Sequence, residues 1–182
     1  RNCLLNYTGL GFRNINAVLR NTWNYQVNGA LSPELKKEYT LLGDQIRKVL
    51  NKALELPMGI KTYRGVSINA FYAYNISTIQ DLKYLENGYL FEDGFTSTSL
   101  IKEKCFYYKN PYTLTGKPNI LIEYLIPQDS CDGIPLISEE LSLAVSQDEF
   151  LINSSSLFKV TKVSVDHSNN TAFLQVLLIP EK

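Results

Sequence analysis

The spacing of apolar residues changes once along the chain, near residue 57, and this change limits the possible folds most strongly. From Ser32 to Ala53, apolar side chains recur every three or four residues, which predicts a helix. Ser32 is a suitable cap, Pro33 suits the first helical position, and Pro57 ends the segment. An earlier helix is expected over residues 12–25, because its apolar side chains also share one face.

After residue 59 the chain is dominated by β-branched and aromatic residues in short runs, which are typical of strands. We predict strands over residues 60–66, 94–100, 119–126, 147–152, 157–166 and 171–179. A short helix is expected from Ser77, and the polar residues 167–170 predict the turn of a hairpin. Helices followed by many strands, without regular alternation, favour an α+β domain over a doubly wound parallel sheet.

Composition narrows the function classes. At 182 residues, a single domain over 1–182 is expected, and 45% hydrophobic with 20% charged residues argues against disorder. The net charge is zero and the pI is near 6.8, so no basic field would attract nucleic acid or an anionic membrane. No apolar run approaches the roughly 18 residues of a membrane-spanning helix. We therefore expect neither a nucleic-acid partner nor a stable membrane association.

Cysteine and histidine usage argues against a metal centre. Cys3, Cys105 and Cys131 are an odd number without paired spacing, so free thiols are expected rather than a disulfide framework or a zinc site. His167 is the only histidine and lies in the predicted turn, where it cannot serve as the base of a Ser-His or Cys-His hydrolase. We expect no metal.

Three short polar motifs stand on predicted strands: Tyr63-Arg64-Gly65, Phe95-Thr96-Ser97-Thr98-Ser99-Leu100 and Gln147-Asp148-Glu149. Each motif alone is short and occurs often by chance. Their joint occurrence, in this order and each on a strand, is much more specific. It resembles the arginine-serine-glutamate class of mono-ADP-ribosyltransferases, and within it the small single-domain bacterial exoenzymes that modify Rho-type GTPases.

The resemblance extends from about residue 14 to residue 152 and implies a fold and a setting. The implied fold is the toxin-like ADP-ribosyltransferase fold: two packed mixed β-sheets flanked by N-terminal helices, with an NAD cleft between them. The implied protein is a monomer that is secreted from a bacterium and acts in the host cytosol. Uptake would depend on a separate delivery component or an unspecific route.

The resemblance also implies roles toward NAD, the co-substrate. Breaking the bond between nicotinamide and ribose leaves positive charge on the ribose, which Glu149 would stabilise. Arg64 would bind the phosphates through its planar fork of donors, and the backbone of Gly65 would hold the nicotinamide amide. Ser97 would orient Glu149, and Phe95 would form a wall of the nicotinamide pocket.

Further NAD contacts are implied on a helix and a loop. Asn16 and Arg20 lie four residues apart, so one helix face can present both toward the NAD phosphates and adenosine. Leu114 and Lys117 stand where the family has an aromatic residue and an arginine, in a loop that closes over NAD. A lysine can serve a phosphate only as a point charge, without the bidentate fork.

Gln147 indicates which residue accepts the ADP-ribose. A glutamine at this position resembles the branch of the family that modifies an asparagine of Rho-type GTPases. A carboxamide can both donate to and accept from an asparagine side chain and so orient it. The loop over 137–146 would recognise the protein substrate, with Ala144 where the branch has an aromatic residue. Two alternatives stay open: an NAD glycohydrolase, favoured by Ala144, and a non-catalytic binding module, favoured by the departures in the loop over NAD.

Overall fold

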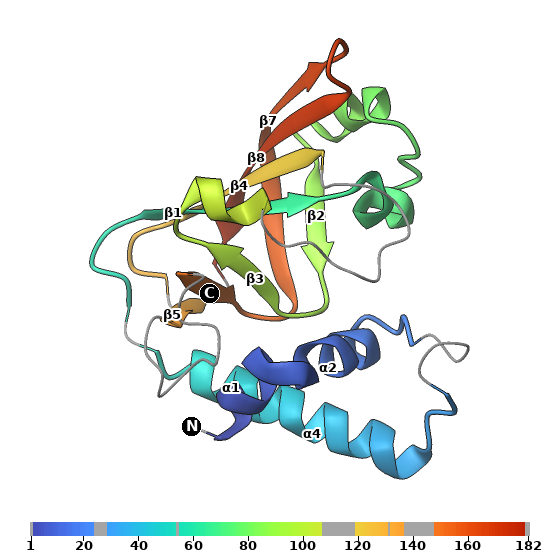
Figure 1. Cartoon of the computed structure of the whole chain (residues 1–182). Helices are drawn as coiled ribbons and strands as arrows, with labels where there is room; N and C mark the ends of the chain where they lie inside the picture. Colours follow the sequence, from blue (N-terminus) through green and yellow to red (C-terminus); the bar gives the residue numbers. More distant parts are fainter. Residues whose placement is uncertain are drawn as a thin grey trace. The chain divides into compact units, whose positions relative to one another are not determined.

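Helices occupy the first third of the chain and strands most of the remainder, which confirms the α+β class (Figure 1). The computed structural model describes residues 2–23, 29–53, 55–106, 119–130, 132–136 and 148–180. The helices are α1 (Asn2–Asn6), the π-helix η1 (Tyr7–Gly11), α2 (Phe12–Leu19), α4 (Pro33–Leu50) and the 3-10 helices η2 (Ile68–Tyr74), η3 (Gln80–Leu85) and η4 (Lys102–Phe106). The strands are β1 (Ile60–Val66), β2 (Tyr89–Glu92), β3 (Thr96–Ser99), β4 (Ile120–Ile126), β5 (Gly133–Leu136), β6 (Glu149–Ile152), β7 (Ser156–Asp166) and β8 (Thr171–Ile179).

Helix α4 begins as predicted. The Ser32 side chain accepts a hydrogen bond from the backbone nitrogen of Leu35 at 3.1 Å, and Pro33 is the first helical residue. Helix α2 ends at Leu19, earlier than the expected 12–25. Asn21 has a left-handed backbone with φ of 54°, which an α-helix cannot continue through.

All six predicted strands are present, and residues 167–170 form the predicted turn between β7 and β8. The helix expected from Ser77 is the 3-10 helix η3. Strands β2 and β5 and the N-terminal helices α1 and η1 had not been predicted. Strand β5 is short and contains Gly133 and Pro135, two residues that are depleted in strands.

The described chain forms two compact units, each assembled from three separate segments. Unit 1 comprises 1–55, 92–97 and 131–156; unit 2 comprises 56–91, 98–130 and 157–182. Neither unit is a continuous segment of the chain. That residues 1–182 form a single domain stays a prediction.

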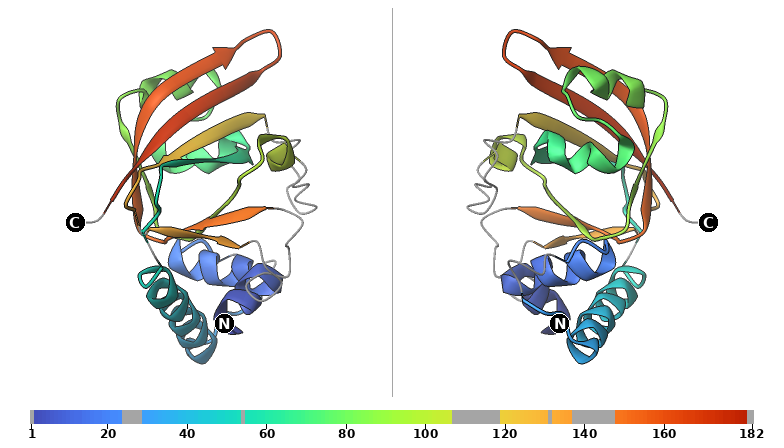
Figure 2. Two further views of the ribbon diagram at one scale, coloured as in Figure 1. Left: turned by 90° about the vertical axis from the view of Figure 1, so that its left-hand side faces the viewer. Right: turned by 90° about the vertical axis from the view of Figure 1, so that its right-hand side faces the viewer.

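In unit 2 the strands follow the order β2-β7-β8-β4-β1, and the pairing is mixed because β4 and β8 are parallel; in unit 1, β5 and β6 pair antiparallel. In unit 2 the long twisted β7–β8 hairpin stands out (Figure 2). Strand β3 belongs to both units, since Thr96 and Ser97 lie in unit 1 and Thr98 and Ser99 in unit 2.

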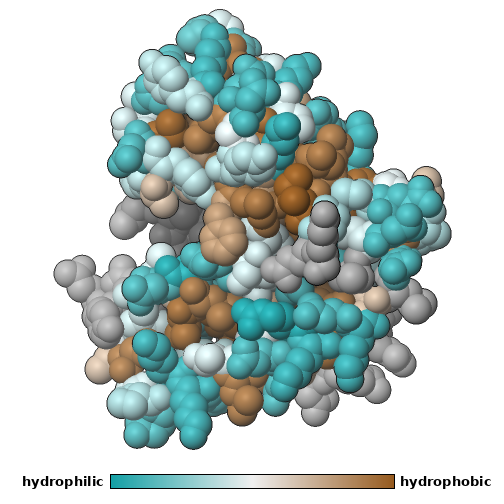
Figure 3. Space-filling view, turned by 180° about the vertical axis from the view of Figure 1, so that it is seen from behind, coloured by the Kyte–Doolittle hydropathy of each residue, from teal (hydrophilic) through white to brown (hydrophobic). Residues whose placement is uncertain are grey.

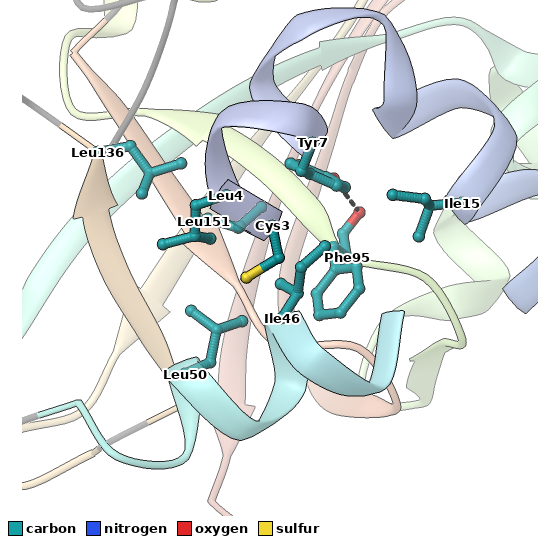
Figure 4. Close-up of a cluster of buried hydrophobic side chains, with 9 residues drawn as sticks. All are labelled: Cys3, Leu4, Tyr7, Ile15, Ile46, Leu50, Phe95, Leu136 and Leu151. Carbon is teal, nitrogen blue, oxygen red and sulfur yellow. Dashed lines mark hydrogen bonds between the residues drawn. The ribbon is translucent and has the colours of Figure 1, made fainter. Parts of the chain in front are cut away.

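The core of unit 1 joins the N-terminal helices to strands β5 and β6 and to Phe95. Nine buried side chains form it: Cys3, Leu4, Tyr7, Ile15, Ile46, Leu50, Phe95, Leu136 and Leu151 (Figure 4). The Tyr7 and Phe95 rings meet edge to face with centroids 5.5 Å apart. Cys3 and Cys105 are buried free thiols, as predicted, whereas Cys131 lies outside the described residues.

The surface mixes polar and apolar side chains (Figure 3). Several aromatic side chains of unit 2 are exposed, among them Tyr84 at 83% and Tyr72 at 56%. Within the residues that the structure describes, no helix has both the length and the apolar character that a membrane span requires.

Candidate active site

The segment that leads into strand β3 is held by Asn16 of helix α2 and by Arg20, the residue that caps the end of this helix. Asn16 donates through Nδ2 to the Phe95 carbonyl at 3.2 Å and accepts through Oδ1 from the Phe95 backbone nitrogen at 2.8 Å. Arg20 donates through a terminal nitrogen to the same carbonyl at 3.3 Å. We call this set of contacts between Asn16, Arg20 and Phe95 the α2 clamp. Asn16 and Arg20 therefore both contact the residue before the Ser-Thr-Ser strand, and their predicted contact with NAD stays a prediction.

Arg20 also forms an ion pair within unit 1. Its Nε lies 2.6 Å from Oε1 of Glu92, and both side chains are partly buried, at 27% and 28% exposed. The same Glu92 oxygen accepts from the backbone nitrogen of Gly94 at 3.0 Å. Glu92 thus fixes one edge of the guanidinium, while a guanidinium has further donors for an anionic ligand.

The α2 clamp requires a glycine at position 94, because the Asn16 and Arg20 side chains lie close to the backbone there. A Cβ atom at this position would lie 2.8 Å from Nε of Arg20 and 2.8 Å from Oδ1 of Asn16. Such distances are well inside van der Waals contact, so any larger residue would displace the hydrogen-bonding groups.

The Phe95 ring is fully buried, at 0% exposed, among the core side chains of unit 1. Its hydrophobic surface is used in packing the N-terminal helices. The predicted contact with nicotinamide stays a prediction, and it would require the ring to leave this core.

Ser97 lies two residues beyond the α2 clamp and is partly exposed. Its neighbour Thr96 is buried at 1%, and the Thr96 hydroxyl has no hydrogen-bond partner. That Ser97 orients Glu149 stays a prediction.

Glu149 is the first residue of β6 and is buried, at 5% exposed. It pairs with Leu136 of β5 and shares a strand face with Leu151, a core residue. Asp148, just before it, has a φ of +46°, a left-handed backbone uncommon for a residue with a side chain. Glu149 therefore directly follows a residue in a sparsely populated backbone conformation, and such strain often marks a functional segment.

Arg64 and Gly65 lie on β1 in unit 2, paired with Ile122 and Leu121 of β4. The Arg64 side chain is half-buried. In the described part of the chain it forms no ion pair and no hydrogen bond. A partly desolvated guanidinium without a partner suits a phosphate group.

A row of polar side chains lies on the face of β1 opposite to Arg64 and consists of Lys61, Tyr63, Glu123 and Gln175. Glu123 is buried at 9% and accepts from Nε2 of Gln175 at 2.7 Å, while Nζ of Lys61 lies 3.9 Å away. The Tyr63 hydroxyl also donates to Glu123, its direct partner across β1 and β4. Burial, followed by the negative charge of Glu123, raises the pKa of the Tyr63 phenol. Tyr63 therefore remains a neutral donor at physiological pH.

Several predicted residues lie outside the described part of the chain: Gln147, Lys117, Leu114, Ala144 and the loop over 137–146. Among the described residues, no group of three or more His, Cys, Asp or Glu side chains could hold a metal. The structure brings Asn16, Arg20 and Phe95 together, and it describes Arg64 and Gly65 within the other unit.

Sequence reasoning missed Tyr7, Glu92 and Gly94 as parts of this site. Tyr7 accepts from Asn16 at 3.0 Å across the helical segment, and the Glu92 contact joins residues 72 positions apart. The one local signal was Gly94 at the start of the predicted strand over 94–100, since a glycine in a strand pattern often marks a close backbone approach.

Comparison with known proteins identifies the family of the chain. The sequence profile described as ADP-ribosyltransferase exoenzyme matches residues 1–179. No curated protein sequence matches the chain.

Solved structures share the fold at low sequence identity. C3stau2 from S. aureus, solved with NAD, is 18% identical with a TM-score of 0.70; the alignment covers 98% of this chain and 85% of that one. The Clostridium limosum C3 exoenzyme is 22% identical with a TM-score of 0.68, covering 98% and 83%. The Vis toxin from Vibrio splendidus is 20% identical with a TM-score of 0.68, covering 98% and 71%.

Proposed function

The chain belongs to the ADP-ribosyltransferase exoenzyme family, and from this premise we propose that it transfers ADP-ribose from NAD to an asparagine of a Rho-type small GTPase. The observation that carries the proposal is the family match over 1–179, with Arg64, Ser97 and Glu149 in the family's order. One structural relative was solved with NAD, which supports NAD as the co-substrate.

The chemistry follows from the charge that develops. The bond between ribose C1′ and the nicotinamide nitrogen breaks, its electron pair leaves with nicotinamide, and the ribose becomes an oxocarbenium-like cation. Glu149 supplies the compensating negative charge, and a buried carboxylate acts more strongly than one in water. The acceptor nitrogen then bonds to C1′ and loses a proton.

Arg64 binds the pyrophosphate, which is supported by its half-buried guanidinium without an internal partner. Gly65 lets the nicotinamide amide approach the β1 backbone, and Lys117 adds a point charge at the phosphates. Arg20 contributes the guanidinium edge that Glu92 leaves open. These roles hold the co-substrate still while the bond breaks.

Gln147 orients the acceptor. Its carboxamide can donate to and accept from the asparagine side chain of the GTPase, which keeps a weak nucleophile aligned with C1′. The loop over 137–146, with Ala144, recognises the protein substrate. We place the enzyme outside its bacterium and in the host cytosol, as a monomer brought in by a separate component.

The test is incubation of the protein with labelled NAD and purified Rho GTPase, measuring labelled GTPase and free nicotinamide. Glu149→Ala should lower both products by on the order of 100-fold or more, because it removes the transition-state charge. Gln147→Ala should reduce GTPase labelling much more than nicotinamide release. Glu38→Ala, an exposed change on helix α4, is the matched control and should leave both rates unchanged.

Each other outcome selects a different function. Nicotinamide release without labelled GTPase would replace the transferase by an NAD glycohydrolase. Neither product, with NAD still bound in a calorimetric titration, would indicate a binding module. Labelling at an arginine rather than an asparagine would contradict the role of Gln147.

A further inference from the structure

We infer that Asn16 is a positioning residue that holds Ser97 in place through the Phe95 backbone, rather than a ligand of NAD; the inference rests on the proposed function. An asparagine side chain has two N–H donors and one acceptor oxygen. In Asn16 the amide nitrogen donates to the Tyr7 hydroxyl and to the Phe95 carbonyl, and the oxygen accepts from the Phe95 nitrogen. The side chain is 6% exposed, so little of it remains for a ligand.

The backbone carbonyl and the backbone nitrogen of Phe95 differ in how many hydrogen-bond partners they have. Its carbonyl receives three donors, from Tyr7 at 3.4 Å, Asn16 at 3.2 Å and Arg20 at 3.3 Å. Its backbone nitrogen has Asn16 as its hydrogen-bond acceptor, at 2.8 Å. Loss of Asn16 would therefore leave a buried N–H group without a partner, which is costly.

Ser97 is the residue that such a loss would disturb. Strand β3 begins at Thr96, directly after the clamped residue, and Ser97 is the next residue along. A short strand has few ladder hydrogen bonds to correct a displaced start. Catalytic geometry is sensitive to such errors, since a displacement of about 1 Å can reduce a rate by roughly 100-fold.

The experiment compares Asn16→Ala with Asn14→Ala, measuring kcat for nicotinamide release and the NAD dissociation constant. Asn14 is a matched control because it lies on the same helix and also donates to a tyrosine hydroxyl, that of Tyr39 at 2.9 Å, but not to Phe95. Asn16→Ala should lower kcat about ten-fold with the NAD dissociation constant within about two-fold of the original. Asn14→Ala should change neither.

A double-mutant cycle with Ser97→Ala tests the route of the effect. If Asn16 acts through Ser97, Asn16→Ala should lower kcat by no more than about two-fold in the Ser97→Ala background. Should Asn16→Ala prevent folding, Tyr7→Phe takes its place in the cycle. It removes one donor to the Phe95 carbonyl and should lower kcat by about two-fold, again with unchanged NAD binding.

Several outcomes would overturn the inference. They are a weaker NAD affinity at constant kcat after Asn16→Ala, equal effects of Asn16→Ala and Asn14→Ala, or full additivity with Ser97→Ala. A failure of the proposed function would look different, because Glu149→Ala and Ser97→Ala would then leave nicotinamide release unchanged.

Discussion

The strand that carries Arg64 and the strand that carries Ser97 are held in place by different means. Strand β1 pairs with β4 along all seven of its residues, from Ile60 opposite Ile126 to Val66 opposite Ile120. Strand β3 has only four residues, and Phe95, the residue before it, is held by the side chain of Asn16 on helix α2. A long ladder fixes a functional residue through the backbone, whereas a short strand depends on a few distant side chains.

This difference decides where a substitution should affect chemistry. Backbone hydrogen bonds survive most side-chain changes, so β1 should tolerate substitutions near Arg64 with a loss of stability only. The α2 clamp consists of side-chain hydrogen bonds, so a single substitution can release the start of β3. The comparison predicts that stability and turnover change together at the α2 clamp and separately along strand β1.

The largest effect is expected for Gly94→Ala, which breaks the α2 clamp sterically. The new Cβ would lie 2.8 Å from both Arg20 Nε and Asn16 Oδ1, and these groups would have to move. We expect the free energy of unfolding to fall by about 2–4 kcal/mol, from strain and lost buried hydrogen bonds. Nicotinamide release should fall with it. Urea unfolding and a kinetic assay at a temperature where the variant is folded measure the two effects.

Gly43→Ala is the matched control for this substitution. Its Cβ would meet Leu19 at 3.4 Å, an ordinary contact, on helix α4. Replacing a helical glycine by alanine should raise the free energy of unfolding by roughly 0.5–1 kcal/mol. If Gly94→Ala behaved like Gly43→Ala, the clamp would have no role in holding β3.

A smaller effect is expected in unit 2, for Glu123→Gln. The amide keeps the size of the side chain but loses the charge that strengthens the bonds from Gln175 and Tyr63. The free energy of unfolding should fall by about 1–2 kcal/mol. Turnover should stay within about two-fold, because the β1 ladder still holds Arg64. Loss of turnover without loss of stability would refute the contrast between the strands.

Lys61→Ala supplies the control for Glu123→Gln. Its ammonium group is 3.9 Å from Glu123 and its side chain is 59% exposed. Solvent screens such a pair, so the change should cost less than about 0.5 kcal/mol. If Lys61→Ala lowered the free energy of unfolding more than Glu123→Gln does, the charge of the polar row would stabilise unit 2 more than its hydrogen bonds do.

The sequence predicted those parts of the fold that depend on local patterns. The cap at Ser32, the start of helix α4 and the six longer strands follow from residue spacing and turn chemistry. Strands β2 and β5 were not predicted, because four residues carry little periodicity and β5 contains Gly133 and Pro135. Their pairing depends on neighbours distant in sequence.

The candidate site, like the fold, was predicted only where local residue spacing determines it. Asn16 and Arg20 were predicted to share a helix face, since four-residue spacing determines that. Their partners were not predictable, because Glu92 and Phe95 lie more than 70 residues away. Nor did spacing indicate the left-handed backbone of Asp148, directly before β6.

Strands β1 and β3 share one feature. Thr62 on β1 and Thr96 on β3 are each buried, and each has a hydroxyl without a hydrogen-bond partner. Since an unpaired buried hydroxyl is unfavourable, Thr62→Val and Thr96→Val should each raise the free energy of unfolding by about 1 kcal/mol. Thermal unfolding measures this gain, and the nicotinamide assay measures whether it is neutral for turnover. We expect Thr62→Val to leave turnover unchanged. A loss of turnover for Thr96→Val alone would show that the hydroxyl beside Ser97 is used during the reaction, and that the clamped strand carries function at more than one residue.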